Sequence, residues 1–382
     1  MGLAGLGGAS LLLGCSEEAV QSVEGEGPNE ALGGSWPLFR GDAGMTGVTS
    51  SSLMPPLNLR WSVEAEAPVP ATAVLDRDQA YIGSLDEWFY ALDLKTGSIL
   101  WKAEVDLGVE GAACLAGEVV AVGNADGFLV ALDRSTGEER WSYETEDSIV
   151  GGGNLVSLED GTELILIGSD DFFLHAVEAS TGKIRWKVET ENYVKGAPTV
   201  DPVSGVALFG GCDEILRLID VENGELIRTV EIGAYLANTC AVADQTAYLA
   251  HYGGEVLAVD LAEGETIWTY EAGGEYVASP AASEEEIVVA GRNQKLISLD
   301  RKTGELRWEF LARKGMDSSP VIAGDVIFVG SDDGRLYAVD RQGGTELWSY
   351  DIGSRINSSP AVTNDSLVIG SQGGGIYCFE KS

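Results

Sequence analysis

The residue types that usually carry catalysis or bind metals are few and scattered in this sequence. Its 382 residues include two histidines, His175 and His251, and five cysteines, none of them in a C-x-x-C pair. Two histidines are too few for most zinc sites or for a histidine-activated nucleophile with its usual partners. No P-loop, nucleotide fingerprint or Ser-His-Asp pattern is present. The sequence therefore argues against hydrolases, kinases and most zinc enzymes, and the four cysteines after Cys15 are interpreted as small buried hydrophobes.

Carboxylates dominate the remaining polar groups. Asp and Glu number 61 against 24 Lys and Arg, which gives a net charge of −37 at pH 7. A surface of this sign repels nucleic acid and anionic lipid headgroups, so we expect no nucleic-acid partner. Hydrophobic residues make up 45% of the chain, enough for a packed core. The acidity fits either the steering of a basic partner or adaptation to high salt.

Most of the chain consists of a repeat of 40 to 45 residues, and the structure of this repeat must position any functional group. The repeat is clearest at Ala91–Trp101, which reads A-L-D-L-K-T-G-S-I-L-W, and the same frame recurs to the end of the chain. Each unit has an acidic residue, a Gly four residues later and a Trp eight residues later, except that Arg228 replaces the Trp of the fourth unit. The acidic positions are Asp93, Asp133, Glu178, Asp220, Asp260, Asp300 and Asp340, and the tryptophans are Trp101, Trp141, Trp186, Trp268, Trp308 and Trp348.

Each unit predicts four short antiparallel strands. Alternating apolar runs such as Phe89–Leu92 and Ile99–Trp101 are separated by Gly, Asp and Asn turns. A period of this length with four strands is typical of a β-propeller blade. The eighth unit lacks its last strand, whereas Leu59–Val63, which contains Trp61, looks like an outer strand without preceding strands. We therefore predict an all-β, eight-bladed propeller over residues 59–382, whose four-stranded antiparallel blades form a ring closed by this N-terminal strand.

The repeated residues are interpreted as structural. The Asp at the end of the third strand is expected to accept hydrogen bonds from the T-G turn, and the Gly to supply a positive φ. Each Trp is expected to lie on small residues of a neighbouring blade, such as Gly or Ala91 or Ala131, and to bury ~150–250 Å². This favours core packing over a cofactor role for the tryptophans.

The N-terminal 58 residues are expected to form three segments. In residues 1–15 an apolar stretch too short to span a bilayer ends in Leu12-Leu13-Gly14-Cys15, which resembles a bacterial lipobox, so Cys15 is the predicted lipidation site. Residues 16–35, rich in Glu, Gly and Ser, predict a flexible tether, and residues 36–58 an N-terminal arm. The pattern predicts an exported protein anchored by lipid on the periplasmic or cell-surface side of a bacterial membrane, the outer membrane being favoured.

The repeat resembles that of the pyrroloquinoline-quinone (PQQ) repeat propellers over residues 59–382. One branch of this family contains the quinoprotein alcohol and sugar dehydrogenases, eight-bladed enzymes that hold PQQ and Ca²⁺ in a funnel on the axis. The other contains BamB-like lipoproteins, which are non-enzymatic, similar in length to this chain and work in outer-membrane β-barrel assembly. The segment Trp36–Asp42 also resembles a lead-in common among such proteins.

The enzyme branch implies features that this sequence does not offer. Its members typically have a vicinal Cys-Cys disulfide over the quinone, a Trp floor, and Glu, Asn and Asp around Ca²⁺. No two cysteines are adjacent here, and seven of the nine tryptophans belong to the repeat, which leaves Trp36 and Trp88. We therefore expect no resident cofactor or metal, with PQQ and Ca²⁺ kept as the alternative.

Polar side chains are still expected at one mouth of the central channel. They come just before the small-residue segments, such as Ser318-Ser319-Pro320, that should begin the innermost strands. Such a ring could hold a small anion or cation, or could simply line a solvated pore. The candidates are Glu110, Lys195, Asp317 and Asn357, with Arg355 close by.

The BamB-like branch implies a binding loop for a barrel partner in a middle blade. The family's apolar-Arg-Gly stretch matches Val194, Lys195 and Gly196, with Tyr193 beside them, although Lys lacks the bidentate fork of Arg. The family's acidic pair falls on Leu236 and Asn238, so the scaffold could serve a different partner.

Aromatic residues in predicted hairpins form a second candidate contact surface, because exposed aromatics often mark contacts, with burial between blades as the alternative. They are Trp88, Phe172 and Phe173. The sequence as a whole favours a non-catalytic protein-interaction scaffold. A quinoprotein dehydrogenase-like protein and a ligand-sensing propeller remain the alternatives.

Overall fold

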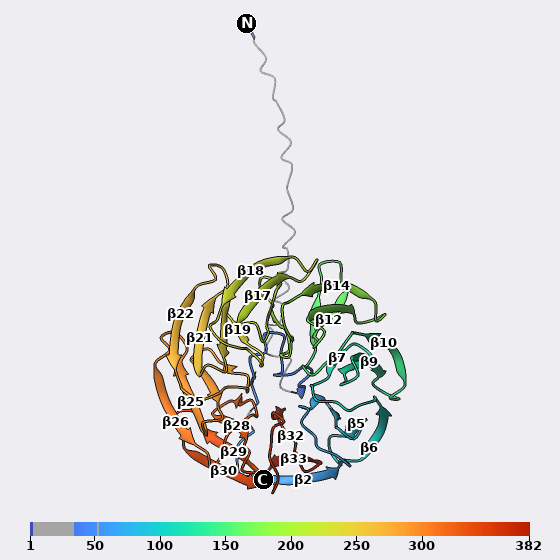
Figure 1. Ribbon diagram of the computed structural model, residues 1–382, viewed down its shortest axis with the longest axis vertical. Helices are drawn as coiled ribbons and strands as arrows, with labels where there is room; N and C mark the ends of the chain where they lie inside the picture. The colour runs from blue at the N-terminus through green and yellow to red at the C-terminus, as the bar shows by residue number, and fades with distance from the viewer. Residues whose placement is uncertain (3–33, 52) are drawn as a thin grey trace.

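The computed structural model describes residues 1–2, 34–51 and 53–382 (Figure 1). In this part of the chain, eight sheets stand around a central axis, and their order around the ring follows their order in the sequence. Each sheet has four antiparallel strands, and in the first seven blades the first strand in the chain is the innermost. The sheet of blade seven gains one further strand from the N-terminal arm. This confirms the predicted eight-bladed propeller. Cys15, the predicted signal segment and most of the predicted tether lie outside the described residues.

The strands of the first seven blades follow one another without interruption. Blades one to three are β3 (Val74–Asp76), β4 (Gln79–Gly83), β5 (Trp88–Asp93), β6 (Ile99–Glu104); β7 (Cys114–Ala116), β8 (Val119–Gly123), β9 (Phe128–Asp133), β10 (Glu139–Glu144); and β11 (Asn154–Ser157), β12 (Glu163–Gly168), β13 (Phe173–Glu178), β14 (Ile184–Glu189). Blades four and five are β15 (Thr199–Asp201), β16 (Val206–Gly210), β17 (Ile215–Asp220), β18 (Leu226–Glu231); and β19 (Ala241–Ala243), β20 (Thr246–Ala250), β21 (Glu255–Asp260), β22 (Thr266–Glu271). Blades six and seven are β23 (Ala281–Ala282), β24 (Glu286–Ala290), β25 (Lys295–Asp300), β26 (Leu306–Leu311); and β27 (Val321–Ala323), β28 (Val326–Gly330), β29 (Arg335–Asp340), β30 (Glu346–Asp351).

The eighth blade joins the two ends of the chain. Its strands β31 (Ala361–Val362), β32 (Leu367–Gly370) and β33 (Gly375–Lys381) are completed by β2 (Leu57–Glu64), which lies blue beside dark red β33 in Figure 1. Trp61 stands opposite Cys378 in this antiparallel pair. The predicted closure by the segment around Trp61 is therefore confirmed, and it pairs the sheet edge that β33 would otherwise expose.

The repeated Trp and Gly residues form the contact between successive blades. A Cβ added at Gly97, whose φ is +73°, would lie 2.7 Å from Cδ2 of Trp61 in the preceding blade, so no other residue fits without a shift. The Trp61 indole also donates to the carbonyl oxygen of Leu94 over 2.9 Å. The predicted contact of the Trp with a Gly of the neighbouring blade is therefore confirmed. The predicted contacts with Ala91 and Ala131 of a neighbouring blade are wrong, because these residues lie opposite Trp101 and Trp141 within the same sheets.

The repeated Asp stabilises the turn that presents this Gly. Asp93 Oδ1 accepts hydrogen bonds from the backbone N–H and the hydroxyl of Thr96, each over 2.7 Å. These bonds hold the pKa of Asp93 below its ordinary value. In the fourth blade, Arg228 takes the place of Trp and donates from its guanidinium to the carbonyl oxygens of Ala262 and Glu263 in the next blade.

The arm was expected only as a lead-in, but it occupies one end of the central channel. Along residues 36–51 it hydrogen-bonds the innermost part of every blade in chain order. Its contacts are with Leu75, Leu115, Asn154, Val200, Val242, Ala282, Ile322 and Thr363. The short strand β1 (Val48–Thr49) adds a parallel fifth strand beside β27. We call this end the arm face, and the opposite end, which holds the loops between blades, the linker face.

Candidate functional site

The predicted polar residues lie at equivalent positions of the linker face, four residues before the start of each innermost strand. The equivalent positions of the eight blades form a ring at the channel mouth. Four of its eight residues are apolar, so the ring is a weak candidate for a ligand site. Its members are Pro70, Glu110, Val150, Lys195, Ala237, Val277, Asp317 and Asn357. Glu110 is exposed, and within residues 34–51 and 53–382 it forms no ion pair. The structure therefore separates the candidates into two groups on different blades.

The first group links blades six to eight. Arg292 donates from Nε and Nη2 to the two carboxylate oxygens of Asp317, each over 2.9 Å, and contacts Glu275 over 3.1 Å. Asn357 Nδ2 donates to Asp317 over 3.4 Å. Burial, followed by the nearby Asp317 charge, raises the pKa of Asp332, while Arg355 acts in the opposite direction. The Arg292–Asp317 pair is charge-compensated and fixes the loops, whereas Oδ1 of Asp332 is buried without a hydrogen-bond partner among the described residues.

The second group projects from blades three and four. Phe172 and Tyr193 are each 40% exposed, and their ring centroids lie 5.2 Å apart. Lys195 Nζ lies 5.0 Å from the Tyr193 ring centroid and 2.8 Å from Asp170 Oδ2. Two bonds of 2.8 Å from Thr190 to the Phe172 carbonyl oxygen hold the loop. We call Phe172, Tyr193 and Lys195 the aromatic patch.

The other predicted contact residues are less accessible. Val194 is fully buried and packs against Gly168. Trp88 and Phe173 are half-buried, because Lys102 Nζ lies 3.9 Å and Lys187 Nζ 4.0 Å from their ring centroids. The structure therefore brings Tyr193 and Lys195 together with Phe172 but not with Trp88, Phe173 or Val194.

A buried chain of polar groups contains His175. Its Nε2 lies 3.1 Å from Asp171 Oδ2, and its Nδ1 lies 3.0 Å from the Tyr143 hydroxyl. Burial lowers the pKa of His175, partly offset by Asp171. Tyr90 and Tyr337 stand at the same repeat position and donate to Asp86 and Asp333. The His175 contact is thus a variant of a turn-stabilising pair that recurs in the propeller.

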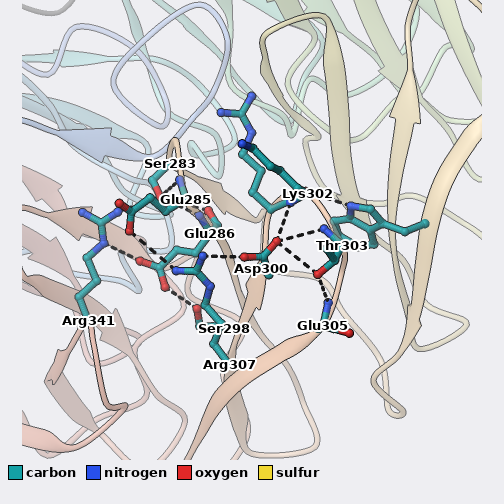
Figure 2. Close-up of polar contacts among 12 residues, drawn as sticks. Ser283, Glu285, Glu286, Ser298, Asp300, Lys302, Thr303, Glu305, Arg307 and Arg341 are labelled. Atoms are coloured by element: carbon teal, nitrogen blue, oxygen red, sulfur yellow. Dashed lines mark hydrogen bonds and ion pairs between the residues drawn. The ribbon is translucent and has the colours of Figure 1, made fainter.

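Sequence reasoning missed a pocket of about 990 Å³ on the arm face. It lies between the arm and blades four to seven. Arg341 Nε contacts Glu286 Oε1 over 2.5 Å, and its Nη2 donates to Ser283 over 2.9 Å (Figure 2). Glu286, whose side chain is 3% exposed, also accepts from Ser298.

A second ion-pair group lies on the wall of this pocket. Arg307 contacts Asp300 over 2.7 Å and Glu285 over 3.8 Å (Figure 2). The available signal was an Arg directly after the repeated Asp, at 134, 301 and 341, where other units have apolar residues such as Leu94 and Val221. Of these three, Arg301 and Arg341 line the pocket. The paired charges stabilise contacts between blades and line the pocket.

The residues present do not fit a quinone site of the kind implied by the dehydrogenase branch. In the described chain, Cys114, Cys212, Cys240 and Cys378 are all free, and no group of three or more His, Cys, Asp and Glu is placed to hold a metal ion. The ring at the channel mouth offers Val150, Ala237 and Val277 in place of an aromatic plate. Among the described residues there is also no helix of the length and apolarity that a membrane crossing requires.

Comparison with known proteins supports one family. Among proteins with curated descriptions, none matches this sequence. Among solved structures, BamB from Moraxella catarrhalis is similar with a TM-score of 0.74 at 20% identity, over 85% of this chain and 99% of that one. The quinohemoprotein alcohol dehydrogenase from Comamonas testosteroni gives 0.77 at 16% identity, over 92% and 81%. A europium-containing methanol dehydrogenase gives 0.78 at 15% identity, over 91% and 98%.

These identities show a shared fold and no more. The family comparison is more specific, since it matches residues 58–173 and 212–382, most of the propeller. The gap from 174 to 211 contains Tyr193 and Lys195. On this match, the chain belongs to the PQQ-like propeller family described as outer membrane protein assembly factor BamB.

Proposed function

We propose that this protein is a non-catalytic, exported scaffold that binds a protein of the outer-membrane assembly machinery. Cys15 carries the lipid anchor, residues 1–15 are the signal and residues 16–35 the tether. The propeller then stands on the periplasmic or cell-surface side of the membrane and presents its linker face. Family membership and the absence of a fitted quinone site among the described residues support this proposal.

The aromatic patch is the observation that carries the proposed contact. Its two rings are exposed, touch each other and stand on loops held by backbone hydrogen bonds. Rigid, exposed aromatic residues lose little entropy on binding and are common among residues that dominate interfaces. Lys195 stands over the Tyr193 ring and is paired with Asp170 over 2.8 Å, so the two exposed rings, not a free positive charge, are the proposed anchors.

The proposal is tested with the purified full chain and the periplasmic domains of the barrel-assembly protein from the same organism. Tyr193→Ala and Phe172→Ala should each weaken binding tenfold or more, as expected for interface anchors. Leu347→Ala, an exposed residue of the outer strand β30, is the matched control and should bind like the wild type. Equal affinity of all four proteins, or no binding by the wild type, would exclude this role for the patch.

The enzymatic alternative predicts a different result. A PQQ/Ca²⁺-dependent dehydrogenase would show saturable quinone absorbance and dye reduction when the purified protein is mixed with PQQ and Ca²⁺. The proposed scaffold shows neither. A ligand-sensing propeller would instead reveal itself by thermal stabilisation with a sugar or an ion.

A further inference from the structure

Arg40 of the arm lies inside the central channel and is the largest fully buried side chain of the described residues. Its Nη2 donates to the carbonyl oxygens of Pro280 over 3.1 Å and Pro320 over 2.5 Å. Within residues 34–51 and 53–382, its Nε and Nη1 have no hydrogen-bond acceptor. Leaving a buried charged donor unpaired is costly, so the channel must supply an acceptor.

The nearest candidate counterion is already committed elsewhere. Asp42 accepts hydrogen bonds from the backbone N–H of Thr46 over 3.0 Å and from its hydroxyl. Among the described ion pairs there is none between Asp42 and Arg40 within 4.0 Å. Burial lowers the pKa of Arg40 to about 9, which still leaves the guanidinium charged at neutral pH. A positive charge therefore stands in the channel without a contacting anion from the described chain.

A layer of hydroxyl groups stands one residue before the prolines that Arg40 contacts. Ser279 and Ser319 immediately precede the two prolines that Arg40 contacts. In this layer the backbone N–H of one blade donates to the hydroxyl oxygen of the next, over 2.8 to 3.1 Å. The five hydroxyls are those of Thr239, Ser279, Ser319, Ser359 and Thr72.

Each of these hydroxyls keeps its own hydrogen to donate. Their oxygens accept from the backbone, and none of the five donates to another group in the described part of the chain. All five residues are 2–6% exposed, so little open space adjoins them. The layer thus offers several buried O–H donors in the same part of the channel wall as the two prolines that accept from Arg40.

The opposite side of the layer is apolar. In the three blades that lack a hydroxyl, the equivalent residues are Ala112, Gly152 and Ala197. Phe39 of the arm packs against Gly152 on this apolar side of the layer. A Cβ built on Gly152 would be 3.1 Å from Phe39 Cβ and 3.5 Å from Ala112 Cβ. Donors are therefore concentrated on one side of the channel, and no carboxylate belongs to this layer.

We propose that the central channel binds a small inorganic anion the size of chloride between Arg40 and the hydroxyl layer. A single-atom anion accepts hydrogen bonds from any direction, which suits convergent O–H and N–H donors in a confined space, whereas an oxyanion needs more room. The surface of the protein is strongly acidic and repels anions. An anion bound in the channel can therefore be distinguished from nonspecific binding of anions at the surface.

Crystals of the full chain soaked in bromide provide the direct test. An anomalous peak in hydrogen-bonding contact with Arg40 Nε or Nη1 is expected. Ordered water at both nitrogens, with no anomalous signal there in crystals that bind bromide elsewhere, would overturn the proposal.

A solution experiment tests the same site without crystals. Chloride should raise the melting temperature relative to gluconate at equal ionic strength, and Arg40→Met should abolish the difference. Because that variant also alters the core, a second variant combines Ser279→Ala with Ser319→Ala. It should increase the half-saturating chloride concentration about tenfold through the two lost donors. Arg335→Met, in the outer part of blade seven, is the control and should respond to chloride like the wild type. An unchanged chloride response in the serine variant would contradict the site.

Discussion

Trp308 of the sixth blade lies on Gly344 of the seventh, and a Cβ built on Gly344 would be 2.5 Å from Cε3 of the indole. The same indole nitrogen donates to the carbonyl oxygen of Arg341 over 2.8 Å. One residue therefore fixes both the distance between two blades and the course of a turn. Seven junctions have a Gly at this position, from the junction of blades eight and one to that of blades six and seven. In six of them the Gly faces a Trp, and in the junction of blades four and five it faces Arg228.

Gly344→Ala should lower the free energy of unfolding by about 2–4 kcal/mol. The new methyl group overlaps the Trp308 ring, and Ala is strained at a φ of +67°. Gly353→Ala is the matched control, since Gly353 has a φ of +84° but no atom within 4 Å of an added Cβ. It should cost only about 1 kcal/mol. Urea unfolding measures both, and equal losses would show that the Trp contact has no role.

Arg228→Trp should stabilise the protein by about 1 kcal/mol. The indole would cover Gly264 as in the other blades and replace a charged guanidinium by a large apolar surface. Arg228→Ala should destabilise it, because both hydrogen bonds to the fifth blade are lost. Thermal unfolding of the two variants decides this, and a lower stability of Arg228→Trp would contradict the equivalence of the positions.

Arg341→Met should destabilise the protein by about 3 kcal/mol. Glu286 would keep a buried carboxylate without its cation, a situation more costly than the loss of an exposed pair. Arg335→Met removes the partner of Asp351, which is 55% exposed, and should cost less than about 1 kcal/mol. If Glu286→Gln combined with Arg341→Met recovers none of the loss, the unpaired carboxylate is not its cause.

His175 should make stability depend on pH below neutrality. Burial lowers its pKa in the folded state, so the unfolded chain binds a proton first and stability falls as pH drops below about 6.5. His175→Tyr, which imitates Tyr90 and Tyr337, should remove this part of the dependence while keeping a donor to Asp171. Urea unfolding at pH 7.5 and 5.5 compares the two proteins, and groups common to both cancel. Parallel curves would exclude His175 as the titrating group.

The architecture was predictable because the signals that build each blade are local and repeated. An acidic residue, Gly and Trp stand four residues apart in most units; the acidic residue stabilises the turn, and the Trp–Gly contact joins adjacent blades. The segment around Trp61 could be assigned to the eighth blade for the same reason, since its Trp matches the outer strands of the other Trp-containing units.

The sites were less predictable because their contacts join distant residues. Arg341 and Glu286 are 55 positions apart, and Arg40 contacts prolines that are 240 and 280 positions away. Neither distance leaves a periodic trace in the sequence. Phe172 and Phe173 looked equivalent, but Phe172 adopts a φ of +75° and turns outward while Phe173 continues into β13. Hairpin conformation, not residue type, separates the exposed ring from the half-buried one.

The pairing of β2 with β33 sets the order of events during biosynthesis. Leu57–Glu64 leaves the ribosome long before its partner Gly375–Lys381, the last strand of the propeller in chain order. Until β33 is made, every nascent chain carries two unpaired sheet edges and an open ring, so a premature stop before residue 375 yields a product open to proteolysis and intermolecular strand exchange. Closure of the ring thus depends on the strand that is synthesised after all the other strands of the propeller.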